Sequence, residues 1–262
     1  MMRALTRTNF HSSRLVRVLA DLAVVDGRAP DGDFAEKLGL WVKFTDAIAL
    51  SAVHNASTAS LPDTPAGAQS ACRLALSEAY ARVRANLVNS ITRCGLFDAD
   101  RTRMEPPSPE PGADMEDATT YKPYRRNYLA QQRDIELKVR PLRIHVREVL
   151  GQSSPALRKL ATLDAALDAI LSERESKLFS TIPALLEKRF HQLRSAHQQA
   201  LVETLQAGKP GAQMQPAGWL AGFGQELQTV LLAELDVRLQ PTLGLIEAFN
   251  LNSTTTQHHI NV

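Results

Sequence analysis

One stretch of the sequence combines residue types that can bind nucleic acid. Tyr121, Tyr124 and Tyr128 lie three and four residues apart, which puts them on one face of a helix, and Arg125 and Arg126 lie between them. Basic residues interleaved with aromatic ones can bind a phosphate backbone and stack on bases. Residues 120–150 contain eight basic and three acidic residues. The candidate interaction residues are Tyr121, Tyr124, Arg125, Arg126, Tyr128, Arg133 and Arg140.

The same stretch has a second interpretation, in which it only builds a helix. Tyr128 begins a seam with alternating spacings of four and three, which continues through Gln132, Ile135, Val139, Leu142, Val146 and Val149. Such a seam buries one face of a helix in a bundle or coiled coil. The tyrosines would extend the seam, and the arginines would face solvent or pair with acidic residues. We favour this interpretation because the net charge is only +2 and no nucleic-acid motif occurs.

Several polar residues have to be placed relative to this seam. We expect Gln132 at its rim, half in water, with a buried position that fixes helix register as the alternative. Asp164 and Asp168 are four residues apart and are expected to be exposed. Glu234 and Asp236, near Arg238, are expected to form an ion network on the surface.

Motifs for catalysis and metal binding are absent from the sequence. There is no G-x-S-x-G elbow, phosphate-binding P-loop or dinucleotide fingerprint. A di-iron site in a helical bundle needs Glu-x-x-His on two helices, and no such pair occurs. We therefore expect no catalytic, cofactor-binding or metal-binding residues.

Apolar residues recur with helical spacing throughout the chain. Leu and Ala dominate an apolar fraction of 44%, and Val and Ile do not gather into alternating runs. We therefore predict an all-α, elongated helical bundle with at least five helices longer than ten residues and no sheet. The predicted buried faces are Leu15, Val18, Leu19 and Leu22 in the first helix, Phe34, Leu38, Trp41, Thr45, Ile48 and Ala52 in the second, and Cys72, Ala75, Leu76, Ala79, Val83, Leu87 and Ile91 in the third.

Two long helices follow, joined near Ser154, which is a good N-cap before Pro155. A last helix is predicted at 215–249. Pro141 predicts a kink, or a break near Arg140, and Pro183 a kink; Pro241 should kink or end the last helix.

The predicted organisation has four parts. Residues 1–97 form an N-terminal three-helix region, and 98–119 form an acidic, proline-rich linker with seven acidic and two basic residues. Residues 120–250 form the long-helix region, and 251–262 a flexible tail. We also expect the linker to compete with anionic partners for Arg125, Arg126, Arg133 and Arg140.

The cellular compartment is predicted from apolar runs and cysteines. No run approaches the roughly 20 apolar residues that span a bilayer. Cys72 and Cys94 are expected on one helix about 33 Å apart, too far for a disulfide. These features favour a cytoplasmic protein without membrane insertion.

Three segments resemble an uncharacterised proteobacterial family of unknown function. The first is Phe34-Ala35-Glu36-Lys37-Leu38-Gly39 together with Thr45-Asp46-Ala47-Ile48-Ala49-Leu50, the second is Tyr124-Arg125-Arg126-Asn127-Tyr128, and the third is residues 233–241, which end in Leu239-Gln240-Pro241. Members of that family are often encoded beside a proton channel of the flagellar-stator (MotA) and TolQ/ExbB type and an OmpA-like peptidoglycan-binding protein. The resemblance implies no activity, but it implies a bacterial protein that serves a proton-driven envelope machine.

Two functions remain open at this point. The first is a non-enzymatic helical interaction or adaptor protein, with a proton-channel subunit as partner and with homo-oligomers also open. The alternative is a nucleic-acid-binding module that uses the basic segment 122–147.

Overall fold

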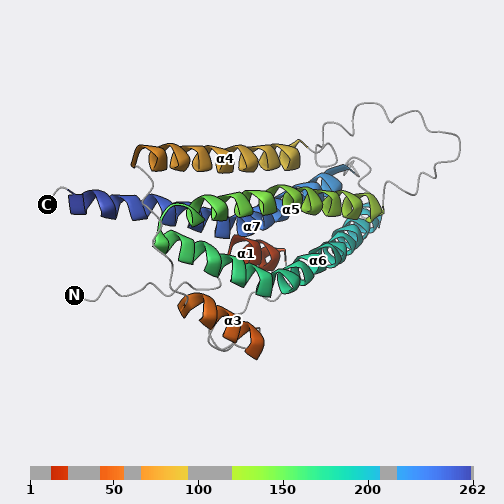
Figure 1. Cartoon of the computed structure of the whole chain (residues 1–262). Helices are drawn as coiled ribbons and strands as arrows, with labels where there is room; N and C mark the ends of the chain where they lie inside the picture. Colours follow the sequence, from red (N-terminus) through yellow and green to blue (C-terminus); the bar gives the residue numbers. More distant parts are fainter. Residues whose placement is uncertain (1–12, 23–41, 56–65, 94–119, 207–216, 261–262) are drawn as a thin grey trace, which may run out of the picture. The chain divides into compact units, whose positions relative to one another are not determined.

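The computed structural model describes residues 13–22, 42–55, 66–93, 120–206 and 217–260. All regular structure in these ranges is α-helical, and five of its helices are longer than ten residues, so the all-α prediction is confirmed (Figure 1). The helices are α1 (Arg14–Asp21), α3 (Phe44–Asn55), α4 (Ala66–Thr92), α5 (Lys122–Gly151), α6 (Pro155–Gln206) and α7 (Ala217–Ile260).

The chain divides into two compact units, each assembled from three separate stretches of sequence. The first unit comprises residues 1–29, 87–134 and 180–237, and the second comprises 30–86, 135–179 and 238–262. Helices α4, α5, α6 and α7 therefore each contribute residues to both units. This division differs from the predicted boundaries at 97 and 119, because segments far apart in sequence share one core.

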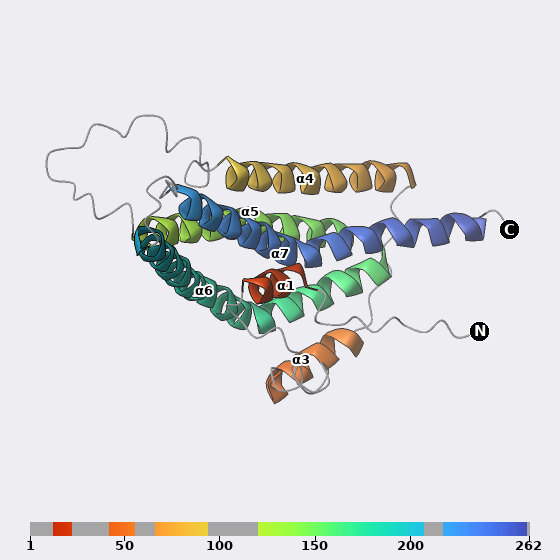
Figure 2. The ribbon, with the colours of Figure 1, turned by 180° about the vertical axis from the view of Figure 1, so that it is seen from behind.

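The core of the first unit joins parts of α5, α6 and α7 with α1 and the C-terminal end of α4. In this unit α5 and α7 lie side by side in both views (Figure 1 and Figure 2). Arg189 of α6 forms an ion pair with Glu226 of α7 at 2.6 Å. The buried residues include Leu15, Leu19, Leu87, Ile91, Tyr121, Tyr124, Tyr128, Ile182, Leu186, Phe190, Phe223, Leu227, Val230, Leu231 and Leu235.

The second unit has a separate core, which α5 enters with the rest of its predicted seam. Val149 is half-buried, and Leu150 beside it is buried instead. The buried residues of this core include Leu76, Ile135, Val139, Leu142, Val146, Leu150, Leu157, Ala161, Phe179, Leu239, Leu245, Ile246 and Phe249.

The three long helices continue through their internal prolines, Pro141, Pro183 and Pro241. The break near Arg140 and the end of the last helix at Pro241, each predicted as an alternative to a kink, therefore do not occur, and the kinks stay a prediction. Buried side chains lie on both sides of each proline, such as Val139 and Leu142 in α5. Their packing keeps the helix continuous although each proline removes one backbone donor.

The ends of α6 and α7 test two further predictions. Ser154 caps α6 as predicted, because its Oγ accepts a hydrogen bond from the backbone N–H of Leu157 at 3.3 Å. At the other end, α7 continues to Ile260, so most of the predicted flexible tail, 251–262, is helical.

Two predicted buried faces need correction. In α4, Leu76, Leu87 and Ile91 are buried, but Cys72 and Ala75 are exposed. In α3 no residue is buried, so the prediction for Thr45, Ile48 and Ala52 is wrong. The predictions for Phe34, Leu38, Trp41, Cys94 and the linker at 98–119 lie outside the described residues.

Candidate interaction surface

The three tyrosines of the candidate set lie in the core of the first unit. The rings of Tyr121 and Tyr124 pack against Phe190 and Phe223, with ring centroids between 5.3 and 6.2 Å apart. The Tyr121 hydroxyl donates a hydrogen bond to the backbone carbonyl of Pro183 at 2.6 Å. Burial raises the pKa of both Tyr121 and Tyr124. The tyrosine rings are therefore core residues and offer no exposed face on which a base could stack.

The four arginines of the candidate set are exposed. Arg125, Arg126 and Arg133 belong to the first unit, and Arg140 belongs to the second. In the first unit, Arg126 and Arg133 share a helical face with Lys122 and Leu129, at spacings of four, three and four. All four of these side chains are exposed, and we call them the basic face of α5. Sequence and structure thus separate the candidate set into a buried aromatic part and an exposed basic part.

A buried carboxylate lies behind the tyrosines, in the first unit. Glu234 of α7 has no exposed surface. Its carboxylate accepts hydrogen bonds from the hydroxyl of Tyr128 at 2.8 Å and from Nε2 of Gln132 at 2.9 Å. The predicted surface position of Glu234 and the predicted rim position of Gln132 are both wrong.

The burial of Glu234 could have been predicted from its spacing in the sequence. It follows Val230 and Leu231 by four and three residues, and therefore lies on the same apolar face. The other two members of the predicted network do remain at the surface of their units. Asp236 pairs with Arg14 of α1 at 2.8 Å, and the guanidinium of Arg238 lies 4.0 Å from the ring centroid of Phe179.

The second unit contains a network of four charged side chains that joins α5 to α6. Arg143 contacts Asp164 at 2.6 Å and Asp168 at 2.8 Å, and Arg147 contacts the same two carboxylates at 2.6 and 2.9 Å. The aspartates are half-buried, so their predicted exposure is wrong. Burial alone would lower the pKa of Arg143, but the hydrogen bond to Asp164 and the two carboxylate charges raise it overall. The network stabilises the turn between the two helices.

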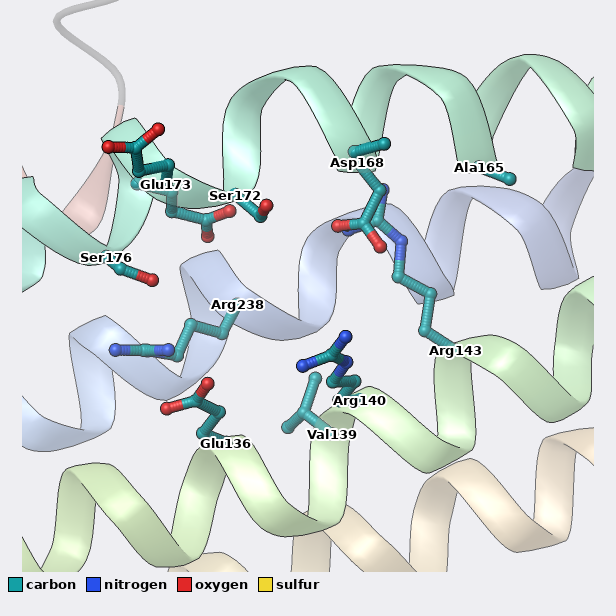
Figure 3. A pocket seen from close by; sticks show the side chains of 12 residues that line it. Glu136, Val139, Arg140, Arg143, Ala165, Asp168, Ser172, Glu173, Ser176 and Arg238 are labelled. Atoms are coloured by element: carbon teal, nitrogen blue, oxygen red, sulfur yellow. The ribbon is translucent and has the colours of Figure 1, made fainter.

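A pocket of about 390 Å³ opens beside this network, also within the second unit. Figure 3 shows Glu136 and Arg140 of α5 on one wall, Asp168 of α6 opposite and Arg238 of α7 between them. Glu175 also lines the pocket, and burial raises the pKa of its carboxyl although Arg238 and Arg143 oppose the shift. The described lining residues include no histidine or cysteine, and the pocket presents acidic and basic side chains together with the hydroxyls of Ser172 and Ser176.

Comparison with known proteins identifies a family without assigning an activity. A family model described as "Protein of unknown function (DUF3348)" matches residues 1–251. The chain belongs to the DUF3348 family. Searches of curated proteins and of solved structures found no match. The function of this member of the DUF3348 family has to be inferred from its own residues.

Two searches of the described residues add to this account of the DUF3348 chain. None of the described helices contains a stretch that is both long and apolar enough to cross a bilayer. Within the same ranges, no group of three or more His, Cys, Asp and Glu side chains is arranged to hold a metal ion. Within the described residues, the exposed basic face and the charged pocket are two features that could take part in an interaction.

Proposed function

We propose that this protein is a non-enzymatic helical adaptor that acts by contact, and that the basic face of α5 is its binding surface. The observation that carries the proposal is the division of α5 in the first unit into two sides. One side buries Tyr121, Tyr124 and Tyr128 against α6 and α7. The other presents Lys122, Arg126 and Arg133 around an exposed Leu129. The buried side makes α5 rigid, so the exposed cations are held in a fixed row.

The basic face favours a protein partner of a definite chemistry. Guanidinium groups pair with carboxylates through two parallel hydrogen bonds, and a large aliphatic side chain gains free energy when it is covered. An acidic amphipathic helix supplies both, because it can place Asp or Glu on either side of an apolar residue. We therefore propose an acidic helical segment of a protein as the partner.

The partner that we propose to test first is a cytoplasmic segment of a proton-channel subunit. The sequence resemblance to a family that is encoded beside such channels supports this choice. An exposed, free Cys72 is compatible with the reducing cytoplasm. Nucleic acid is a weaker alternative because the tyrosines that would stack on bases are buried.

The experiment is a binding measurement with the purified full chain and purified cytoplasmic segments of a flagellar-stator-type channel subunit. Charge reversal in the double variant Arg126→Glu and Arg133→Glu should weaken binding by at least about 10-fold, since each lost charge pair at an interface costs about 1 kcal/mol or more. The matched control is the double variant Arg17→Glu and Arg82→Glu, which makes the same change of charge at exposed positions of α1 and α4.

Binding by the wild type and the control, but not by the basic-face variant, supports the proposal. Equal binding by all three proteins, or no binding by the wild type, would show that the basic face does not bind this partner. A duplex DNA of mixed sequence serves as the second ligand. Binding to DNA but not to the channel segments would support the nucleic-acid alternative instead.

A further inference from the structure

The charged pocket of the second unit contains polar groups that the fold itself does not use. The pocket has a volume of about 390 Å³ and is lined by α5, α6 and α7. Some of its charges are already paired, since Asp168 contacts Arg143 at 2.8 Å and Glu173 contacts Lys177 at 2.7 Å. The remaining lining groups are the ones that can take a ligand.

Five of the lining side chains have no hydrogen-bond or ion-pair partner among the described residues. They are Glu136, Arg140, Ser172, Glu175 and Ser176. Glu136 and Arg140 are four residues apart on α5 with the acid first, which is the order that favours an ion pair within a helix. They form no such pair, and Figure 3 shows both directed from α5 toward the two serines of α6. Polar groups that converge on a cavity in this way are typical of a binding site.

The space is open because α6 carries small side chains where it lines the pocket. These are Ala165, Ala169, Ser172 and Ser176, at spacings of four, three and four, which place them on one face of the helix. The volume lies within the range of sites for small molecules, about 300–1,000 Å³. Most such sites have a largely apolar lining, whereas most of the residues that line this pocket are polar or charged. The pocket therefore suits a small polar molecule.

We propose that this pocket binds a free amino acid, whose carboxylate pairs with Arg140 and whose ammonium group pairs with Glu136. A guanidinium offers two parallel N–H donors to a carboxylate, and a carboxylate accepts hydrogen bonds from an ammonium group. Side chains four residues apart on a helix are neighbours, about 5–6 Å apart at their Cβ atoms. This spacing fits a ligand that carries both charges on one carbon atom. The hydroxyls of Ser172 and Ser176 supply further donors and acceptors from the opposite wall.

The balance of charge favours a ligand with one charge of each sign. Outside the ion pairs named above, the lining contains two cations, Arg140 and Arg238, and two acids, Glu136 and Glu175. A polyanion would be placed against both acids, and a polyamine against both guanidinium groups. Each would bring like charges together, which costs binding free energy. A zwitterion avoids this cost.

Glu175 is left for the side chain of the ligand, because Arg140 and Glu136 take the two groups on its α-carbon. Burial raises the pKa of the Glu175 carboxyl, although Arg238 opposes the shift. A ligand group that donates a hydrogen bond to Glu175 stabilises the charged carboxylate. Amino acids with a donor in the side chain should therefore bind more tightly than alanine.

The first test is calorimetric titration of the full chain with each common L-amino acid. For the ligand that binds most tightly, Arg140→Gln and Glu136→Gln should each raise the dissociation constant at least about 10-fold, because each removes a charge-assisted hydrogen bond. The matched controls are Arg125→Gln and Glu78→Gln, which make the same changes at exposed positions of α5 and α4 outside the pocket. They should bind as the wild type does. A wild type that binds no amino acid, or equal binding by pocket and control variants, would overturn the proposal.

Two analogues of the tightest ligand test whether both charges are required. One is the amine that lacks the carboxylate, and the other is the acid that lacks the ammonium group. Each should bind at least about 10-fold more weakly than the amino acid. The end of a peptide chain carries only one of the two charges. An analogue that binds as tightly as the amino acid would thus point to a peptide end or a simple ion and contradict the proposal.

The second test fills the pocket. Ser172→Leu puts an aliphatic side chain into the space and removes no hydrogen bond of the described structure, so it should abolish binding without lowering the melting temperature. The control is Ser195→Leu, the same change at an exposed position of α6 in the first unit. Amino-acid binding that survives Ser172→Leu would place the ligand elsewhere and refute this site. The basic face of α5 lies in the other unit, so these results are independent of the adaptor's binding to its partner.

Discussion

Two buried polar residues help to determine the register in which α5 and α7 pack in the core of the first unit. Gln132 and Glu234 occupy positions that the helical spacing assigns to apolar side chains, and each is buried. Their hydrogen bonds are formed only when α5 and α7 meet in the observed register. A buried polar contact of this kind excludes other registers because a shifted pairing would leave the carboxylate without donors.

Tyr128→Phe tests this contact, because it removes only the hydroxyl that donates to Glu234. Hydrogen bonds to charged groups contribute about 1.5–3 kcal/mol, so the free energy of unfolding should fall by about that amount. Tyr124→Phe is the matched control, since Tyr124 is buried in the same cluster and donates no hydrogen bond in the described structure. Urea denaturation measures both variants. Equal effects would mean that the hydroxyl contact contributes nothing specific.

Glu175 gives the second unit a predictable dependence on pH. Its carboxyl has a pKa of 4.5 when unperturbed, and burial raises it in the folded protein. The folded state therefore binds a proton more tightly than the unfolded state, so stability is lost as pH rises from about 4.5 through the raised pKa. In Glu175→Gln this loss is absent.

The melting temperature of Glu175→Gln relative to the wild type should thus increase between about pH 4 and pH 7. Glu173→Gln is the control, because Glu173 is exposed and its pKa is lowered, first by the hydrogen bond from Lys177. A difference between Glu175→Gln and the wild type that stays constant over this range would refute the assignment.

At the level of whole elements, the periodicity of apolar residues predicted where the long helices lie in the sequence. It did not predict correctly which residues of every helix are buried. The seam from Tyr128 to Val146 is buried because one face of α5 carries most of its large apolar residues, although Leu129, Leu137 and Ile144 are exposed. The same reasoning failed for α3, where apolar residues lie on all sides and no single face can be chosen. The prediction also failed for Glu234. A glutamate is usually exposed to solvent, but the spacing of Glu234 from Val230 and Leu231 places it on the buried face of the helix.

The carboxylates between α5 and α6 allow a prediction about this pair of helices. Asp164→Asn should lower the free energy of unfolding by about 1–3 kcal/mol, because Arg143 and Arg147 lose a charged acceptor in a half-buried site. The control is Lys177→Gln, which removes an exposed ion pair with Glu173 within α6 and should have little effect. Both are measured by thermal and urea denaturation. A larger effect of the exposed pair would contradict the proposed role of the network.

Two glycines in α7 can be replaced to stabilise the helix. A Cβ atom added at Gly222 or Gly244 meets no atom within 4 Å, so neither position needs glycine for close packing. Glycine in a helix interior costs about 0.5–1 kcal/mol relative to alanine. Gly222→Ala and Gly244→Ala should each raise the free energy of unfolding by about that amount. A decrease in either variant would mean that glycine is required there for another reason.

For the whole molecule, the attraction to an anionic partner depends more on where the charges lie than on the net charge. The chain carries 30 basic and 28 acidic residues, so its distant field is weak, and no strong attraction for a polyanion follows from the total. Basic residues are nevertheless concentrated on α5, where the sequence predicted them; the structure exposes Arg126 and Arg133 among them, whereas Arg143 and Arg147 are half-buried in ion pairs. What the sequence could not show is that the neighbouring tyrosines turn inward, because this depends on contacts with Phe190 and Phe223, far away along the chain.

Because the basic residues of α5 are exposed and its tyrosines are buried, we can predict the affinity and specificity with which the protein binds DNA. Binding should depend on charge alone. The three cations of the basic face, Lys122, Arg126 and Arg133, can contact at most about three phosphates, so the slope of log affinity against log salt should be no steeper than about −3. Affinity should therefore be low at physiological salt and independent of base sequence. Fluorescence anisotropy with single-stranded and duplex probes over a salt series measures this.

The double variant Arg126→Glu with Arg133→Glu should remove the binding seen at low salt, whereas the control Arg17→Glu with Arg82→Glu should keep it. Tight, sequence-dependent binding at physiological salt would require exposed aromatic rings and would contradict the buried position of Tyr121, Tyr124 and Tyr128.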